Sequence, residues 1–106
     1  MTKQKLTATE VNEAIIAAWK EQYGKVTKYT TEDGKVVYFR SPNRKEVAAA
    51  QAAANESDGV TSNEVLAKAI SLGGDVEILT QDKYLFGLGE HLKKVIEKVE
   101  GELVEL

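Results

Sequence analysis

The residues suited to acid–base or metal chemistry are few and scattered along the chain. His91 is the only histidine and cysteine is absent, which rules out a histidine cluster or a thiolate metal site within these 106 residues. The carboxylates Asp75, Glu77 and Asp82 lack the alternating oxygen ligands and central glycine of a calcium loop. His91 falls at the edge of an apolar helical stripe, which is typical of a surface histidine rather than a general base. We therefore predict a non-enzymatic protein that holds no metal and no cofactor.

Basic and aromatic residues gather in residues 25–45, where they raise the alternative of a nucleic-acid site. Tyr29 and Tyr38 have rings that stack on bases in other proteins. Against this, the sequence pI is about 5.2, whereas a domain built for phosphate contacts is strongly basic. A weak nucleic-acid-binding domain is therefore the lesser alternative. The cations concerned are Lys25, Lys28, Lys35, Arg40, Arg44 and Lys45.

The composition is that of an ordinary folded domain, with 42% hydrophobic and 29% charged residues. The length predicts one domain spanning residues 1–106, with residues 1–6 disordered. No apolar run approaches the length of a membrane span and no secretory leader is evident, so we expect a cytoplasmic protein that does not bind membranes. Residues 1–53 hold nine Lys/Arg and six Asp/Glu, whereas residues 54–106 hold five and eleven. This asymmetry favours an oppositely charged partner or head-to-tail self-association, the alternative being two solvated surfaces.

Two β-rich runs flank an Asp-Gly pair at positions 33–34 and predict an antiparallel hairpin over about residues 25–40. Asp-Gly is favoured in a two-residue type I′ turn, where both central residues take positive φ. Such a turn places Tyr29 opposite Tyr38. It puts these side chains on a common face of the hairpin: Thr27, Tyr29, Thr31, Val36, Tyr38 and Arg40.

Four helices are predicted around this hairpin, giving an α+β class with one small antiparallel sheet. The first covers about residues 8–22, after a capping-box pattern at Thr7 and Glu10, and carries Trp19 on its core-facing stripe. The others follow the hairpin at about 42–56, 62–72 and 82–100.

Three further features set the expected packing. Ser41 and Pro42 predict the N-cap and first turn of the helix at 42–56, whose alanine-rich face favours close internal packing, with docking onto a partner as the alternative. A second capping-box pattern starts at Thr61. Residues 75–79 are interpreted as either an extended linker or a third strand, and the apolar residues of 101–106 as packing back on the domain.

Three stretches together resemble a known family. They are residues 19–26, which join the first helix to the hairpin, residues 38–44 with their Arg-x-Pro-x-Arg pattern, and residues 72–75, Leu-Gly-Gly-Asp, before a closing amphipathic helix. Over about residues 16–106 the chain resembles the small tail assembly chaperones of tailed phages and prophages. The resemblance implies a non-enzymatic protein of the bacterial host cytoplasm that binds a long helical tape-measure protein during tail assembly.

The hairpin and the alanine-rich helix have the surfaces least explained by an internal core. We therefore hypothesise that Tyr29, Tyr38, Arg40 and Arg44 border a partner-binding or self-association surface. The alternative is that both arginines form ion pairs with acids of the C-terminal half. A protein-interaction module with another partner remains the second functional reading.

Overall fold

The structure, a computed structural model, describes residues 6–7, 9–96 and 99–106. It confirms the α+β class, with an N-terminal helix, a hairpin over the predicted residues and helices after it. Within the described residues the elements follow one another as α1 (Glu13–Tyr23), β1 (Val26–Thr30), β2 (Val36–Arg40), α2 (Arg44–Glu56), α3 (Gly59–Ile70), β3 (Ser71–Gly74), α4 (Glu77–Thr80) and α5 (Asp82–Lys94).

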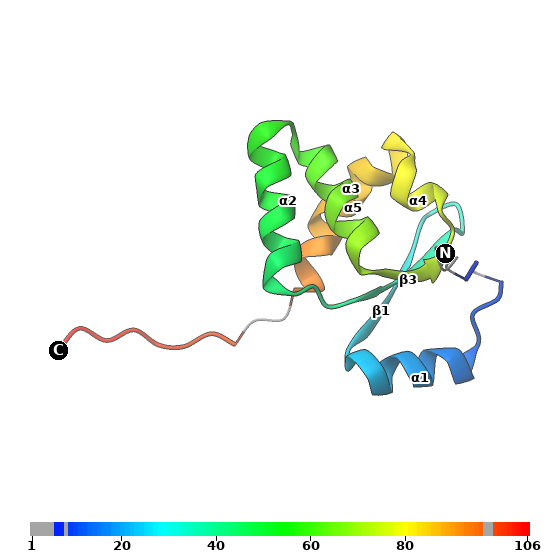
Figure 1. Cartoon of the computed structure of the whole chain (residues 1–106), viewed down its shortest axis with the longest axis horizontal. Helices are drawn as coiled ribbons and strands as arrows, with labels where there is room; N and C mark the ends of the chain where they lie inside the picture. The colour runs from blue at the N-terminus through cyan, green and yellow to red at the C-terminus, as the bar shows by residue number, and fades with distance from the viewer. Residues whose placement is uncertain (1–5, 8, 97–98) are drawn as a thin grey trace.

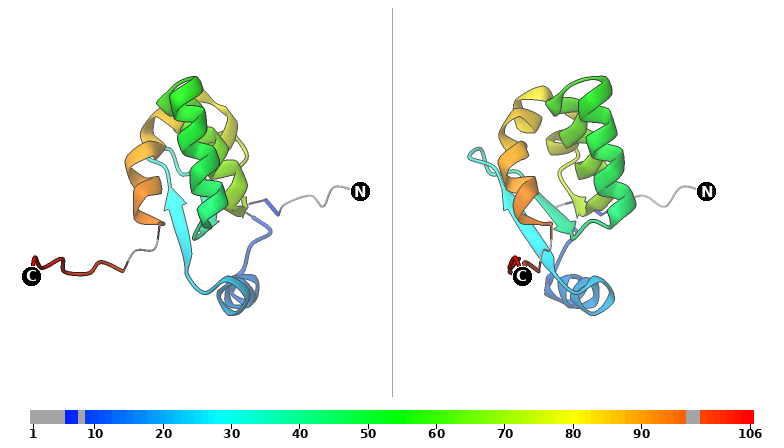
Figure 2. Two further views of the ribbon diagram at one scale, coloured as in Figure 1. Left: turned by 60° about the vertical axis from the view of Figure 1, so that its left-hand side comes forward. Right: turned by 90° about the vertical axis from the view of Figure 1, so that its left-hand side faces the viewer.

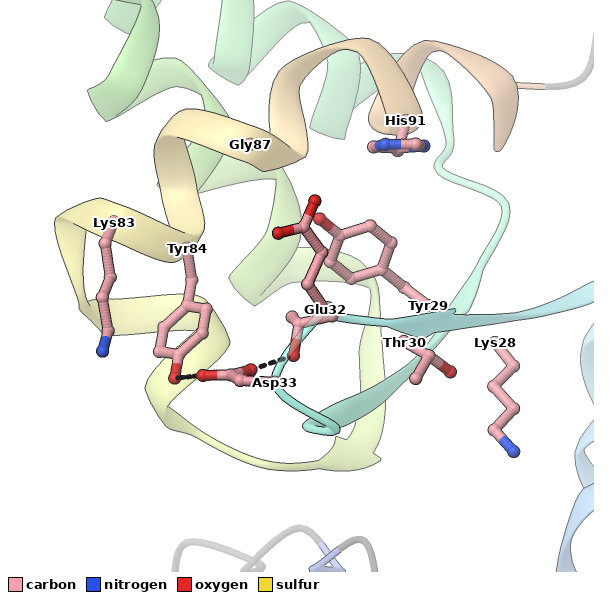
Figure 3. A pocket seen from close by; sticks show the side chains of 10 residues that line it. Lys28, Tyr29, Thr30, Glu32, Asp33, Lys83, Tyr84, Gly87 and His91 are labelled. Atoms are coloured by element: carbon pink, nitrogen blue, oxygen red, sulfur yellow. Dashed lines mark hydrogen bonds between the residues drawn. The ribbon is translucent and has the colours of Figure 1, made fainter.

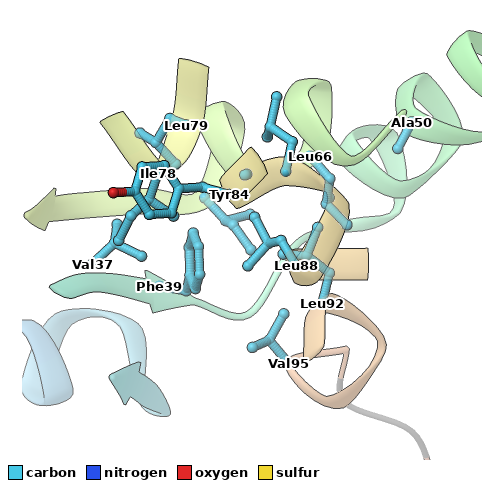
Figure 4. Close-up of a cluster of buried hydrophobic side chains, with 13 residues drawn as sticks. Val37, Phe39, Ala50, Leu66, Ile78, Leu79, Tyr84, Leu88, Leu92 and Val95 are labelled. Atoms are coloured by element: carbon cyan, nitrogen blue, oxygen red, sulfur yellow. The ribbon is translucent and has the colours of Figure 1, made fainter. Parts of the chain in front are cut away.

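A three-stranded antiparallel sheet lies between α1 and the other helices (Figure 1; Figure 2). The strand order is β1-β2-β3, so β2 is central and β1 and β3 are the edges. Val37 and Phe39 of β2 are 0% and 2% exposed and enter the core under α3, α4 and α5 (Figure 4). On the opposite face Trp19 of α1 packs inward as predicted, with its ring 5.7 Å from that of Tyr38.

The hairpin register differs by one residue from the prediction. Only Gly34 has a positive φ (89°) in this turn, so the two-residue type I′ geometry does not form. Instead the Gly34 amide donates to the Thr31 carbonyl (3.0 Å) and the Thr31 amide donates to the Lys35 carbonyl (2.8 Å), which closes a three-residue loop. The Thr31 hydroxyl reinforces this loop, since it accepts from the Lys35 amide at 2.9 Å and donates to Asp33.

This shift changes which side chains share a face. Tyr29 now lies opposite Val37, and Lys28 opposite Tyr38. Tyr29 therefore shares its face with Val37 and Phe39, whereas Tyr38 and Arg40 lie on the other face. The predicted common face of Tyr29 and Tyr38 is wrong, because a one-residue slip moves every side chain of one strand to the opposite side.

A third strand exists, but it is formed by residues 71–74 rather than 75–79. β3 pairs antiparallel with β2 and includes Gly73 and Gly74. Gly74 (φ 130°) lies so close to the backbone of Val36 and Val37 that a Cβ would collide with it. Glycine is therefore required for this close approach. Asp75 then accepts from the Val36 amide at 2.8 Å, and the chain turns into α4.

The outer edge of β3 is partly covered by the start of the described chain. Leu6 forms an isolated parallel bridge with Gly73, and its carbonyl accepts from the Gly74 amide at 2.8 Å. Leu6 was included in the predicted disordered segment. Residues 1–5 of that segment lie outside the described residues.

α1 begins at Glu13, later than the predicted start near residue 8, which itself lies outside the described residues. The Thr7 amide does donate to the Glu10 carboxylate (2.8 Å), but the pair closes an isolated turn. Asn12 is the actual N-cap, because its backbone is extended and its side chain accepts from an amide of the first turn at 3.0 Å.

The two following helices also use other caps than predicted. Asn43, not Ser41, caps α2 and forms a reciprocal capping box with Glu46, at 2.9 Å in both directions. Asp58, not Thr61, caps α3 and accepts from the Thr61 amide at 2.6 Å. Asn43 lies two residues after the predicted cap and Asp58 three residues before it, and each side chain accepts from a free amide of the first turn.

The alanine-rich helix α2 packs against α3 through its small residues, which confirms the favoured interpretation. Ala50 is buried there, and the Ser62 hydroxyl of α3 donates to the Ala50 carbonyl at 2.7 Å. A comparable close approach joins α3 to α5, where a Cβ at Gly89 would lie 3.0 Å from Asn63 Nδ2. The alanines of α2 that face away from α3 remain exposed.

The last helix is shorter than predicted, because α5 ends at Lys94 rather than near residue 100. Its apolar stripe is completed by Val95, which is 3% exposed, and residues 97–98 of the predicted helix lie outside the described residues. Residues 99–106 have no regular secondary structure and extend away from the body (Figure 1). The prediction that the apolar residues of this segment pack back is wrong, since Leu103 and Leu106 are fully exposed.

Candidate functional site

Two of the four predicted surface residues belong to the interior of the fold. Tyr38 is 7% exposed and lies under Trp19. The Arg40 guanidinium bonds both carboxylate oxygens of Glu46 (2.9 and 2.6 Å) and donates to the Ala69 carbonyl at 2.9 Å. These hydrogen bonds raise the pKa of Arg40 and lower that of Glu46. Arg40 is thus paired internally, but with an acid of the N-terminal half rather than of the C-terminal half.

The other two residues are accessible but lie on different elements. Arg44 is the exposed first residue of α2 and makes no ion pair within the part of the chain that the structure describes. Tyr29 lies on β1 and faces α5. The four residues therefore do not form one surface, and the site is better built around Tyr29.

Tyr29 lines a hollow between β1, the hairpin turn and α5, which we call the edge groove (Figure 3). Its volume is about 660 Å³. The Tyr29 ring lies 5.1 Å from that of His91, and its hydroxyl would be 3.8 Å from a Cβ at Gly87. That is an ordinary van der Waals distance, so the tyrosine hydroxyl lies against this turn of α5. The groove is lined by Lys28, Tyr29, Thr30, Thr31, Glu32, Asp33, Lys83, Tyr84, Gly87 and His91.

The tip of the hairpin is tied to α5 at one end of this groove. The Tyr84 hydroxyl donates to the Asp33 carboxylate at 2.6 Å, across 51 residues of sequence (Figure 3). The Thr31 hydroxyl and then Tyr84 lower the pKa of Asp33, and the same carboxylate raises the pKa of Tyr84 to about 12. Burial, with the nearby Glu32 charge, raises the pKa of Tyr29. Both phenols are therefore neutral donors at physiological pH.

A second, smaller hollow of about 110 Å³ adjoins the edge groove along β1. Both hollows share Lys28, Tyr29 and His91. The smaller one adds apolar surface from Phe39 and Val95, together with Thr27 and Lys94. A mixed aromatic and apolar trough thus follows β1 from Thr27 to Thr30 on the α5 side.

The backbone of β1 has one free edge beside this trough. Among the described residues its only strand neighbour is β2. In an antiparallel strand, successive backbone amides point alternately toward the neighbouring strand and away from it. The Thr31 amide donates to the Lys35 carbonyl, so the amides of residues 27 and 29 also point toward β2. The amides of Val26, Lys28 and Thr30 point outward. Such a row of unpaired groups is a template on which another extended chain can add a strand.

The groove offers little for catalysis. His91 is exposed on α5 and stacks on Tyr29, with no carboxylate orienting it among the hydrogen bonds of the described chain. The described residues contain no group of three or more His, Asp or Glu close enough to share a metal ion. What the arrangement can do is hold an extended peptide, with backbone hydrogen bonds from β1 and side-chain contacts in the trough.

The sequence analysis named Tyr29 but missed its neighbours. His91 was interpreted as a surface residue of the last helix, and the structure places it there. Neither its contact with Tyr29 nor the Asp33–Tyr84 bond has a local sequence signal. The Asp-Gly pair predicted the hairpin turn, but Asp33 lines the groove only because α5 packs beside that turn.

Comparisons with protein-family models, curated proteins and solved structures give no match for this chain. The resemblance to tail assembly chaperones therefore stays a prediction. Of the helices in the described ranges, none combines the length and apolar character that crossing a bilayer requires.

Proposed function

We propose that this protein is a non-enzymatic interaction module that binds an extended segment of a protein partner along β1. The observation that carries the proposal is the free edge of β1, whose outward amides at Val26, Lys28 and Thr30 adjoin an aromatic trough. Backbone pairing supplies affinity in this mode of recognition, and pockets beside the edge supply specificity through alternate side chains.

The charges along the edge define the kind of segment that fits. Lys25 and Lys28, with Lys94 of α5, are exposed near the start of β1, whereas Glu32 and Asp33 are at the hairpin tip. A segment with acidic residues near the start of β1 and an apolar side chain over Phe39 and Val95 complements this pattern. On the face turned toward α1, Tyr38 is covered by Trp19 and is not accessible to a partner.

The proposal is tested by peptide display against the full chain, with the selected peptides examined by NMR. We expect bound peptides to slow the hydrogen exchange of the Val26, Lys28 and Thr30 amides. Lys28→Pro removes an outward amide without removing a bond to β2, so it should abolish binding. Lys28→Ala is the matched control, since it keeps the amide and removes only the charge. Selected peptides that leave the β1 amides unchanged would contradict the proposal.

A tail assembly chaperone is a specific form of this function, and it rests on the sequence resemblance alone. It requires a long helical protein as the partner and a bacterial cytoplasmic setting. The burial of Tyr38 removes it from the surface first proposed for such a partner. Nucleic-acid binding loses its main argument, since Tyr29 and Tyr38 lie on opposite faces of the sheet and do not form one stacking platform.

A further inference from the structure

The segment 99–106 is the largest exposed apolar feature outside the folded body. Its sequence is Val-Glu-Gly-Glu-Leu-Val-Glu-Leu, and it extends away from the helices (Figure 1; Figure 2, left). Val99, Leu103 and Leu106 are fully exposed, and Val104 is 65% exposed. Four accessible apolar side chains within eight residues are a costly arrangement in water unless another surface covers them.

The charges of this segment are opposite to those near the start of β1. Glu100, Glu102 and Glu105 are exposed between the apolar positions. Lys25 and Lys28 lie on or just before the edge strand, and Lys94 borders the adjoining hollow. The segment thus has the extended form, the acidic charge and the apolar side chains that the free edge of β1 accepts.

We infer that segment 99–106 of one copy adds as a strand to the free edge of β1 in a second copy. This rests on the proposed function and names its partner as the chain itself. In the antiparallel register that we assign, Glu102 lies opposite Lys28, Gly101 opposite Tyr29 and Leu103 opposite Thr27. Leu103 then lies on the trough side of the sheet, over Phe39 and Val95 of the receiving copy, while Glu102 faces solvent beside the lysine.

This register also accounts for the glycine in the segment. A side chain directly opposite Tyr29 would compete with the aromatic ring for the space beside β1, and Gly101 leaves that space to the ring. The amide and carbonyl of Lys28 point away from β2, toward the added strand. In this register both can form hydrogen bonds with the backbone of Glu102.

The donor segment and the acceptor edge are different surfaces of the molecule, so the contact is heterologous. Two copies can exchange segments reciprocally and close a dimer, or each can pass its segment to the next. Both arrangements give a mass above the protomer value of 11.6 kDa. The segment folding back on its own β1 edge would instead give a monomer at every concentration.

The inference is tested by complementation between two variants of the full chain, with mass measured by light scattering. Leu103→Asp breaks the donor segment, and Lys28→Pro breaks the acceptor edge. Each variant alone should be monomeric over the concentration range in which wild type associates. Their mixture should form a one-to-one heterodimer, because each supplies the surface that the other lacks. Leu106→Asp, outside the assigned register, is the matched control and should associate like wild type.

A charge exchange keeps the test valid if Lys28→Pro disturbs folding. Lys28→Glu and Glu102→Lys should each weaken association about tenfold, because each puts two like charges opposite one another across the two strands. The double variant should associate like wild type, because it restores an attractive pair with the two charges exchanged. Added salt should weaken the wild-type contact. Monomeric wild type at millimolar concentration, or a mixture of the two broken variants that stays monomeric, would overturn the inference.

A synthetic peptide of residues 99–106 separates this inference from the proposed function. If the peptide slows exchange of the outward β1 amides, both stand. If display-selected peptides bind β1 and this peptide does not, the inference fails and the proposed function stands. If neither binds β1, both fail.

Discussion

β1 and β2 are two strands of one hairpin, equal in length, in very different surroundings. β2 is paired on both edges, and its three middle residues, Val37, Tyr38 and Phe39, are all buried. Among the described residues β1 pairs only with β2, and its side chains are half-buried or exposed. The central strand therefore supplies the core, whereas the edge strand leaves backbone groups and a trough available for binding. Whether a strand supplies the core or a binding edge therefore depends more on its position in the sheet than on its residue types.

The largest expected effect comes from replacing a core residue of β2. Phe39→Ala should lower the free energy of unfolding by about 3–5 kcal/mol, because it removes a ring that is 2% exposed and leaves a cavity under α5. Urea denaturation followed by circular dichroism measures this change.

The matched substitution on β1 is Lys28→Ala, which should change stability by no more than about 0.5 kcal/mol. Its side chain is exposed and no contact with the core is lost. Equal losses from the two substitutions would contradict the division of roles between the strands.

The two arginines of the Arg-x-Pro-x-Arg pattern are expected to differ in the same way. Arg40→Met should destabilise the fold by about 2–3 kcal/mol, because Glu46 and the Ala69 carbonyl lose a charged donor. Arg44→Met, at the exposed start of α2, should leave the thermal midpoint nearly unchanged. Thermal unfolding of the two variants side by side checks this. A loss on replacing Arg44 as large as that for Arg40 would show that both are structural.

The smallest effect concerns the link between the hairpin tip and α5. Tyr84→Phe removes a hydrogen bond to Asp33 and should raise the pKa of that carboxyl toward its ordinary value. The pKa of Asp33 is lower in the folded state, so its contribution to stability is present above the ordinary aspartate pKa and is lost as the pH falls through the lowered value. NMR titration of the Asp33 carboxyl in wild type and in Tyr84→Phe measures the shift. An unchanged pKa in Tyr84→Phe would contradict the assigned bond.

Local patterns predicted the elements better than their ends. The apolar spacing gave the long helices, and the Asp-Gly turn gave the hairpin, because both depend on neighbouring residues. The caps were missed by two to five residues, since Asn12, Asn43 and Asp58 compete with nearby residues of similar capping strength. The one-residue error in the hairpin followed from the Thr31 hydroxyl bonds, which favour a longer loop.

The amino-acid sequence by itself determined the class of the fold, the approximate positions of the hairpin and the four longer helices, and the mixture of apolar and acidic residues in 99–106, but not the short helix α4. Only the tertiary structure decided that β2 is central, that Tyr29 faces α5 while Tyr38 faces Trp19, and that β1 keeps a free edge. The reason is that strand order and register depend on contacts between distant residues, such as Val36 with Asp75 and Asp33 with Tyr84. Periodicity within a strand is unchanged by a one-residue slip, whereas the face that each side chain occupies is reversed by it.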